Sequence, residues 1–313
     1  MVKIATLVGC AIGDALGNPF EMWAPTKEGL PEWDGTFKEG GTFWWGQPGQ
    51  YTDDTLMSIA LGTSLVEFQG FNGDDVGSKY LAWMESGNTR GIGGTTARAL
   101  TRLKNGASII ESGVTHTPEG EPCGGNGTAM RASPIGLVYR HNLVKLMEIA
   151  IRDAAITHNS LEPKVGSAAV AMAVALLATR VSTPQSVCWD VSEALTDSIV
   201  KFKLELAQKW LEQGTPMDTI AAEALATIGT AGYVPETVGA AFFCIGATTN
   251  FKDAVIMAVK GGGDTDTTAA IVGAMAGTYY GLEGIPDEYK DGVENFQLLQ
   301  DLTDELVEIN LDS

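Results

Sequence analysis

Apolar residues recur at helical spacing along almost the whole chain, and this pattern limits the fold more than any other feature. Alternating runs of β-branched and aromatic residues, which predict strands, are nearly absent. Glycine, proline and asparagine separate the apolar segments, where helices are expected to stop. The sequence therefore predicts an all-α fold. The expected helices cover residues 2–17, 53–69, 74–86, 95–104, 127–140, 143–157, 161–180, 185–212, 216–228, 236–249, 251–260, 265–281 and 287–309.

The chain has neither an evident linker nor an internal repeat. No Ser/Gly-rich segment or shift in composition divides its 313 residues, of which 44% are hydrophobic. We therefore expect one compact multi-helix domain over residues 1–313. Residues 18–51 are rich in proline and tryptophan, which predicts an ordered loop lying over another part of the protein.

Two segments carry glycine at every fourth position. Because glycine inside a helix costs about 1 kcal/mol relative to alanine, some interaction should offset that cost. A close approach of another backbone along the glycine-lined face would do so. The alternative is chance in a glycine-rich chain. The residues are Gly9, Gly13 and Gly17 in the first segment and Gly273, Gly277 and Gly281 in the second.

The chain is strongly acidic, with 20 Lys+Arg against 39 Asp+Glu and a net charge of −19. This charge argues against direct binding to nucleic-acid phosphates. It is compatible with a small anionic ligand where metal ions or helix N-termini supply positive charge locally. The charge therefore leaves open functions in which the ligand is a small molecule or a group attached to a protein.

Cysteine spacing and apolar run lengths indicate the compartment. The four cysteines form no CxxC pair, which predicts free thiols and a cytoplasmic location. The longest uncharged runs, residues 165–179 and 237–251, are shorter than the roughly 18–20 residues of a membrane span. They predict buried core helices and no membrane partner.

Two acidic clusters stand at expected helix starts, YTDDT at 51–55 and GGGDTDTT at 261–268. Thr52 and Asp264 have the positions of N-caps, and acids in a first turn are common. Capping needs one side-chain acceptor at each start, however, and each start has two aspartates. The pattern leaves two interpretations open, capping alone or a ligand site.

The ligand site would be a metal centre. Carboxylates with neighbouring hydroxyls suit Mg²⁺, Mn²⁺ or Ca²⁺ rather than zinc. If the two clusters meet in space, two divalent ions about 3.5–4 Å apart would offset the repulsion between them.

The stretch DTDTT also resembles two other motifs, a phosphohydrolase nucleophile motif and a calcium-binding loop. It resembles the start of the haloacid-dehalogenase phosphohydrolases, where the first aspartate is a nucleophile after a buried strand; here only residues 269–313 follow, and they look helical. A calcium loop is excluded, because Ala269 and Met275 stand where that loop needs glycine and glutamate.

Two glycine-rich turns precede expected helices, NTRGIGGTTARAL at 88–100 and CGGNGTAMRASPIG at 123–136. Backbone N–H groups at a helix start can bind phosphate, although a flexible loop is the alternative. His158 lies between two apolar helices, where a structural histidine and a catalytic one are both compatible with the pattern.

Five stretches in this order resemble the ADP-ribosylglycohydrolase family: GCAIGDALGNPFE (9–21), YTDDT (51–55), GNGTAMRASPIG (125–136), TH (157–158) and GGDTDTTAAIVGAMAGTYYG (262–281). The family includes the enzyme that removes ADP-ribose from dinitrogenase reductase. The resemblance implies an all-α fold with a binuclear Mg²⁺ centre at the base of a cleft, Mn²⁺ being an alternative.

The resemblance also implies roles for individual residues. The implied metal ligands are Thr52, Asp53, Asp54, Asp264, Asp266 and Thr267. Glu21 matches an acidic residue that gates or assists the site, and the general base is either Glu21 or a metal-bound aspartate, with Asp53, Asp54 and Asp266 as candidates. The implied substrate contacts are Gly93, Gly125, Asn126, Gly127, Met130 and His158. No aromatic residue is assigned to the adenine.

The expected function is Mg²⁺-dependent hydrolysis of the glycosidic bond between ADP-ribose and an acceptor. The partner is ADP-ribose, an ADP-ribosylated protein or an ADP-ribosylated small molecule. The acceptor stays open among arginine, serine, another side chain, a nucleic-acid group and an acetyl ester. The alternatives are a catalytically silent ADP-ribose-binding relative and a Mg²⁺-dependent phosphohydrolase.

Overall fold

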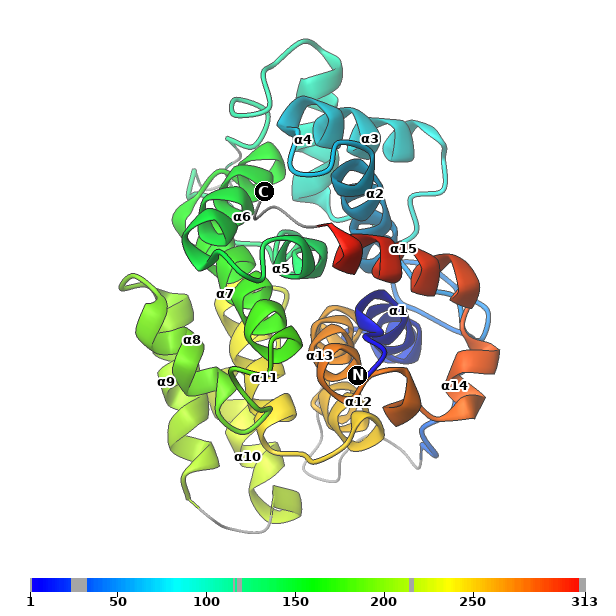
Figure 1. Cartoon of the computed structure of the whole chain (residues 1–313), viewed down its shortest axis with the longest axis vertical. Helices are drawn as coiled ribbons and strands as arrows, with labels where there is room; N and C mark the ends of the chain where they lie inside the picture. The colour runs from blue at the N-terminus through cyan, green and yellow to red at the C-terminus, as the bar shows by residue number, and fades with distance from the viewer. Residues whose placement is uncertain (1, 24–32, 115, 117–119, 214–216, 310–313) are drawn as a thin grey trace.

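The computed structural model describes residues 2–23, 33–114, 116, 120–213 and 217–309. Within these ranges it contains helices and isolated β-bridges but no strand. The predicted all-α fold, a single compact body of packed helices, is confirmed (Figure 1). The α-helices are α1 (Thr6–Gly17), α2 (Asp53–Glu67), α3 (Gly73–Glu85), α4 (Gly94–Lys104), α5 (Ser133–Val138), α6 (Leu143–Thr157), α7 (Leu161–Ala178), α8 (Val187–Ala194), α9 (Ile199–Leu211), α10 (Met217–Ile228), α11 (Val234–Gly246), α12 (Phe251–Lys260), α13 (Thr265–Tyr280), α14 (Asp287–Gly292) and α15 (Phe296–Glu308).

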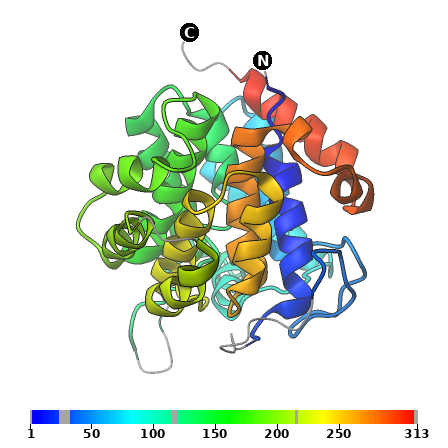
Figure 2. The same cartoon turned by 90° about the horizontal axis from the view of Figure 1, so that it is seen from below.

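Helices α1 and α13 lie side by side in the middle of the molecule (Figures 1 and 2). Their backbones touch along the glycine-lined faces. A Cβ on Gly13 would lie 1.9 Å from the Ala269 carbonyl oxygen, and one on Gly9 would lie 2.1 Å from that of Gly273. Only glycine allows this approach, so the close-packing prediction is confirmed and chance is excluded.

The last glycine of the second series has a different role from the one predicted. Helix α13 ends at Tyr280, and Gly281 is its C-cap with a φ of 70°. A Cβ there would meet the Val2 side chain rather than the backbone of α1. Gly281 therefore ends the helix in a left-handed conformation that glycine adopts at little cost.

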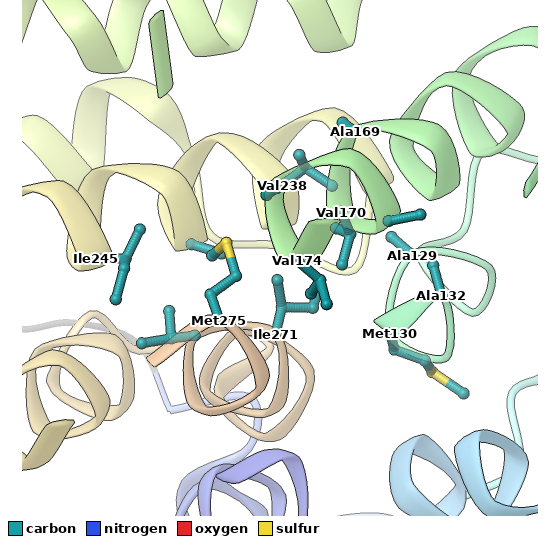
Figure 3. Packing of buried hydrophobic residues seen from close by; sticks show 14 of the residues in the cluster. Ala129, Met130, Ala132, Ala169, Val170, Val174, Val238, Ile245, Ile271 and Met275 are labelled. Atoms are coloured by element: carbon teal, nitrogen blue, oxygen red, sulfur yellow. The ribbon is translucent and has the colours of Figure 1, made fainter. Parts of the chain in front are cut away.

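The core gathers around α7, which packs against α5, α6, α11 and α13 (Figure 1). Figure 3 shows Ile271 of α13 next to Val174 of α7, with Met275 of α13 directed toward α11 and Val238 of α11 near Val170 of α7. Helix α7 is long and apolar enough to cross a membrane, but 78% of its apolar window is buried inside the protein. It is a core helix, as the sequence predicts.

Three expected helices are shorter or divided. The segment 127–140 is helical only from Ser133, because Pro134 has no N–H and fits the first turn, and residues before it form a turn. The segment 185–212 divides into α8 and α9, where Ser198 caps α9 by accepting from the Lys201 N–H. The segment 287–309 divides into α14 and α15 at Asn295, which has a φ of 55°.

The described parts of the segment 18–51 pack on one another and on α14, which agrees with the predicted ordered loop lying over another part of the protein. The Trp33 indole is 9% exposed and packs on Phe20, and Tyr289 donates a hydrogen bond to the Gly35 carbonyl at 2.7 Å. Pro25 and Pro31 lie outside the described residues.

The α1–α13 contact predicts a large effect of one methyl group. We expect Gly13→Ala to lower the free energy of unfolding by about 3 kcal/mol, because the methyl would collide with a carbonyl that cannot rotate away. Gly77→Ala is the matched control, since its Cβ would meet only the side-chain ends of Leu103 and Ile109 at 3.2 Å. Denaturant unfolding measures both; equal stability of the two variants would contradict the packing argument.

Candidate active site

The N-terminal ends of α2 and α13 converge on one cavity of about 480 Å³. Asp53 and Asp54 lie in the first turn of α2, Asp264 is the N-cap of α13, and Asp266 lies in its first turn. Every site residue named from the sequence lines this cavity except Thr52. The predicted residues that line it are Glu21, Asp53, Asp54, Gly93, Gly125, Asn126, Gly127, Met130, His158, Asp264, Asp266 and Thr267.

Consecutive glycines explain how Asp264 and Glu21 come together. Gly262 and Gly263 have φ angles of 69° and 74°, and a Cβ on Gly263 would lie 2.3 Å from the Thr230 carbonyl oxygen. Gly263 also exchanges backbone hydrogen bonds with the segment after Glu21, receiving one from the Met22 N–H at 2.7 Å and donating one to the Trp23 carbonyl at 2.9 Å. One ligand atom each from Glu21, Asp264 and Asp266 consequently lie within 4.8 Å of one another.

Asp14 of α1 fixes the start of α2. Its fully buried carboxylate accepts the backbone N–H groups of Thr52 and Thr55 at 2.9 and 3.1 Å, and their hydroxyls at 2.9 and 2.7 Å. The sequence analysis missed this residue. Its signal is a single acid inside the apolar run GCAIGDALG, where an ionisable group needs several partners.

Thr52 lies behind the cavity wall rather than on it. It is fully buried, and its hydroxyl lies 2.9 Å from Asp14 Oδ1 and 3.2 Å from Asp54 Oδ2. The single hydroxyl hydrogen is donated to one of these carboxylates, so the lone pairs of Thr52 Oγ1 stay available to a cation. Its role as a metal ligand stays a prediction.

The carboxylates share a buried and strongly anionic environment. Burial, followed by repulsion from Asp14, raises the pKa of Asp53 to about 8. Burial, followed by repulsion from Asp264, raises the pKa of Glu21 to about 8 and that of Asp266 well above its usual range. No lysine or arginine is among the described residues that line the cavity.

These residues fit a hard divalent cation. Asp54 is 2% exposed, and its Oδ1 atom has no hydrogen-bond partner among the described residues. A buried carboxylate oxygen without a partner is costly unless an ion or water binds it. Carboxylate and hydroxyl oxygens are the ligands that Mg²⁺ and Mn²⁺ prefer. The cluster can therefore hold metal.

Two glycine turns form another part of the cavity wall. Gly91, with a φ of 75°, passes over Asp53, and a Cβ there would lie 2.9 Å from Oδ1; Gly93 is the N-cap of α4. A Cβ on Gly125 would lie 3.1 Å from His158 Nε2, so glycine leaves the edge of the imidazole open.

Asn126 lies between the two halves of the site. Its Nδ2 group donates to Asp264 Oδ2 at 2.8 Å and lies 3.0 Å from Thr237 Oγ1. The residue therefore steadies a predicted metal ligand, a contact that the sequence analysis did not anticipate. The cavity wall also includes Thr89, Ile92, Thr95 and Thr96 of the glycine-rich turn at 88–100, together with two residues that no motif had indicated, Phe43 and Gly232.

Comparison with known proteins decides the family. The family model for ADP-ribosylglycohydrolase matches residues 4–312. The chain belongs to the ADP-ribosylglycohydrolase family. The resemblance read from the five motifs is thereby confirmed, and so is the class of enzyme, a hydrolase of glycosidic bonds. The dehalogenase interpretation of DTDTT does not fit, because no strand precedes Asp264 among the described residues.

Individual relatives cover nearly the whole chain. A glycohydrolase of Rhodospirillum rubrum named for ADP-ribosyl dinitrogen reductase is 28% identical over 90% of this chain and 87% of its own length. The ADP-ribosylarginine hydrolase Tri1 of Pseudomonas putida is 26% identical over 96% of this chain and 76% of its own. A solved structure named as an ADP-ribosylglycohydrolase-related protein complex has a TM-score of 0.78 at 27% identity, covering 97% of this chain and 96% of that one.

The Asp14 contacts predict that Asp14→Asn damages the site although the volume of the side chain hardly changes. One oxygen becomes an NH₂ group. At the Oδ2 position it takes the acceptor from the Thr55 N–H, and at the Oδ1 position it faces the Thr52 N–H, so either orientation sets two donors against each other. We expect a loss of about 2 kcal/mol in unfolding free energy and weaker Mg²⁺ binding by calorimetry. Asp74→Asn, at an exposed position in α3, is the control. Unchanged Mg²⁺ affinity in Asp14→Asn would contradict the role given to Asp14.

The raised pKa values predict how the metal-free protein responds to pH. Asp53 and Glu21 bind protons more tightly when folded than at their ordinary pKa values of 3.8 and 4.5. The folded state therefore holds more protons between about pH 4 and pH 8, and the free energy of unfolding falls as pH rises through that window. We expect chelator-treated protein to show this fall in denaturant unfolding and Mg²⁺ to reduce it. Stability that rises with pH in the metal-free protein would contradict the cluster's electrostatics.

Proposed function

We propose that this protein hydrolyses the glycosidic bond between ADP-ribose and an acceptor in a Mg²⁺-dependent reaction, releasing ADP-ribose. One observation carries the proposal: the acidic starts of α2 and α13, Glu21 and two glycine turns line a single cavity. The cavity, of about 480 Å³, is in the usual size range of small-ligand sites.

The proposed cofactor is a pair of Mg²⁺ ions, with Mn²⁺ as the alternative. Asp53 and Asp54, with Thr52 behind them, would hold one side of the pair, and Asp264, Asp266 and Thr267 the other. When bound, such ions bind sugar hydroxyls and lower the pKa of a bound water. The partnerless Oδ1 atom of Asp54 supports this donor set.

The glycine turns would hold the phosphate part of the substrate. Gly93 is the N-cap of α4, and free N–H groups at a helix start attract phosphate. Gly125, Gly127 and His158 border the same cavity and offer further donors. These groups would orient the ribose so that its anomeric carbon lies over the carboxylates.

Glu21 is the first candidate for the proton transfer. It is only partly buried, as is Asp264, and its pKa of about 8 is close to neutral pH, as a general base requires. The carboxylates that remain ionised would stabilise the positive charge that develops on the ribose ring during cleavage. A metal-bound aspartate is the other candidate.

Among acceptors, we place an arginine side chain first. Tri1 of Pseudomonas putida is named for ADP-ribosylarginine, and the acidic cavity favours a cationic guanidinium over a neutral serine. The cytoplasmic location that we propose rests on four free, buried cysteines, which suit a reducing compartment.

Replacing one carboxylate tests the proposal. We expect Asp266→Asn to lower Mg²⁺-dependent release of ADP-ribose at least about 100-fold, because an amide is a poor ligand for the cation. Asp197→Asn is the control, since the Asp197 side chain is fully exposed. Both are measured on ADP-ribosylated arginine, serine and acetyl-ester substrates with and without Mg²⁺.

Four outcomes distinguish the alternatives. Release from arginine alone supports the proposed acceptor, whereas release from another substrate moves the acceptor and keeps the reaction. Wild-type turnover in Asp266→Asn would contradict the metal assignment. Binding of ADP-ribose without release from any substrate would favour the silent relative.

A further inference from the structure

A buried cation lies behind the glycine turn of residues 125–127. Arg131 has no exposed surface; its Nε donates to Asp153 Oδ2 at 3.0 Å, and its Nη2 donates to the Asp153 carbonyl at 3.1 Å. Tyr80 donates to Asp153 Oδ1 at 2.8 Å, and the guanidinium lies over the Tyr80 ring, 4.7 Å from its centroid. Helices α3 and α6 thus hold this cation in one orientation.

One nitrogen of Arg131 connects this pair to the cavity. Nη1 carries two hydrogens, and it donates to the Gly127 carbonyl at 2.8 Å and to Thr157 Oγ1 at 2.9 Å. Gly127 belongs to the glycine turn, and Thr157 precedes His158. The turn and the histidine are therefore fixed relative to the same atom, although Arg131 itself does not line the cavity.

The hydrogen bonds of Thr157 determine the tautomer of His158. The Thr157 hydroxyl is fully buried, and its partners among the described residues are Arg131 and His158 Nδ1, which lies 2.9 Å away. Arginine can only donate, so it occupies a lone pair of the hydroxyl. The hydroxyl hydrogen then has one acceptor within reach, the Nδ1 atom, which must carry no proton.

The other ring nitrogen borders the cavity. With Nδ1 as acceptor, a neutral ring carries its proton on Nε2. A Cβ on Gly125 would lie 3.1 Å from Nε2, and one on Gly127 would lie 3.2 Å from Cε1. Glycine at both positions therefore leaves the Nε2–H group free to meet a ligand. Burial, followed by the nearby charges of Arg131 and Arg98, lowers the pKa of His158 to about 3, which keeps the ring neutral.

We propose that Arg131 and Thr157 are positioning residues that hold His158 in its Nε2–H tautomer, so that His158 donates a hydrogen bond to an oxygen of the bound ligand. The naming of that ligand as ADP-ribose rests on the proposed function; the tautomer does not. A neutral donor with fixed direction selects an acceptor oxygen, such as a ribose hydroxyl or a phosphate oxygen, and rejects a group that can only donate.

Nuclear magnetic resonance of the imidazole nitrogens tests the tautomer directly. The chain has three histidines, and His116 and His141 are exposed. A His116→Gln/His141→Gln background labelled with ¹⁵N-histidine therefore leaves His158 as the single imidazole. We expect the Nε2–H pattern throughout roughly pH 5–8, the range in which an ordinary histidine titrates. An Nδ1–H pattern, or a charged ring at neutral pH, overturns the proposal.

Variants of Thr157 test the cause. Thr157→Val keeps the shape but removes the hydroxyl, and we expect a mixture of tautomers; Thr157→Ser keeps the hydroxyl and the parent pattern. Tyr80→Phe removes a hydrogen bond from the same buried group without touching Thr157, so we expect a lower Tm and an unchanged tautomer. Thr157→Ala replaces Thr157→Val should the latter fail to fold. An Nε2–H pattern that survives loss of the Thr157 hydroxyl overturns the positioning role of Thr157. A change of tautomer in Tyr80→Phe overturns it as well.

Calorimetry with ADP-ribose measures the consequence for binding. We expect Thr157→Val to raise the Kd about 3- to 10-fold, the range of one neutral hydrogen bond, and Thr157→Ser to leave it within about 2-fold. Equal Kd values for the Val variant and the parent overturn the role in binding. Absence of ADP-ribose binding in the parent, together with the expected tautomer, would refute the proposed function and leave the Arg131–Thr157 arrangement standing.

Discussion

The contact between the backbones of α1 and α13 determines where the acidic residues of the cleft lie. Helix α13 begins with Asp264 and Asp266, whereas α1 carries Asp14, the acceptor for the first N–H groups of α2. The distance between the two helices therefore sets the distance between the two acidic clusters. Glycine at positions 9, 13 and 273 makes that distance as short as two backbones allow. The packing of two helix backbones thus controls the geometry of the site.

The close approach has an electrostatic cost that the described residues of the cavity wall do not offset. Asp53, Asp54 and Asp266 are almost fully buried, and in each burial is the first cause of a raised pKa. The described cavity wall offers them no lysine or arginine. Such a cluster is stable when ionised only with cations from solution. The same repulsion that weakens the metal-free protein is therefore what makes the site attract divalent ions.

The wall formed by Gly127 and His158 has a buried cation behind it rather than a cluster of buried carboxylates. There the buried charge is the cation of Arg131, paired with Asp153 and separated from the cavity by Gly127, Thr157 and His158. The cavity consequently has a carboxylate side and a side of neutral hydrogen-bond donors. A ligand with sugar hydroxyls at one end and phosphates at the other, as in the proposed substrate, matches both sides.

Local sequence patterns determined much of this. Helical periodicity indicated an all-α fold, four-residue glycine spacing indicated a close backbone approach along one face of α1 and of α13, and paired aspartates marked both acidic helix starts. These features depend on residues within a few turns of one another. The breaks before Ser198 and at Asn295 were missed because a single cap or left-handed residue outweighed a continuous apolar pattern.

Only the tertiary structure decided how the parts meet. Asp14 acts on Thr52, and Arg131 acts on Asp153 and Thr157, through contacts between segments that no local pattern relates. The same holds for Glu21, which reaches Asp264 because Gly263 pairs with Met22 and Trp23. Sequence periodicity reports which face of a helix is buried, but a buried polar group is defined by its partners. Those partners are known only once the chain has folded around them.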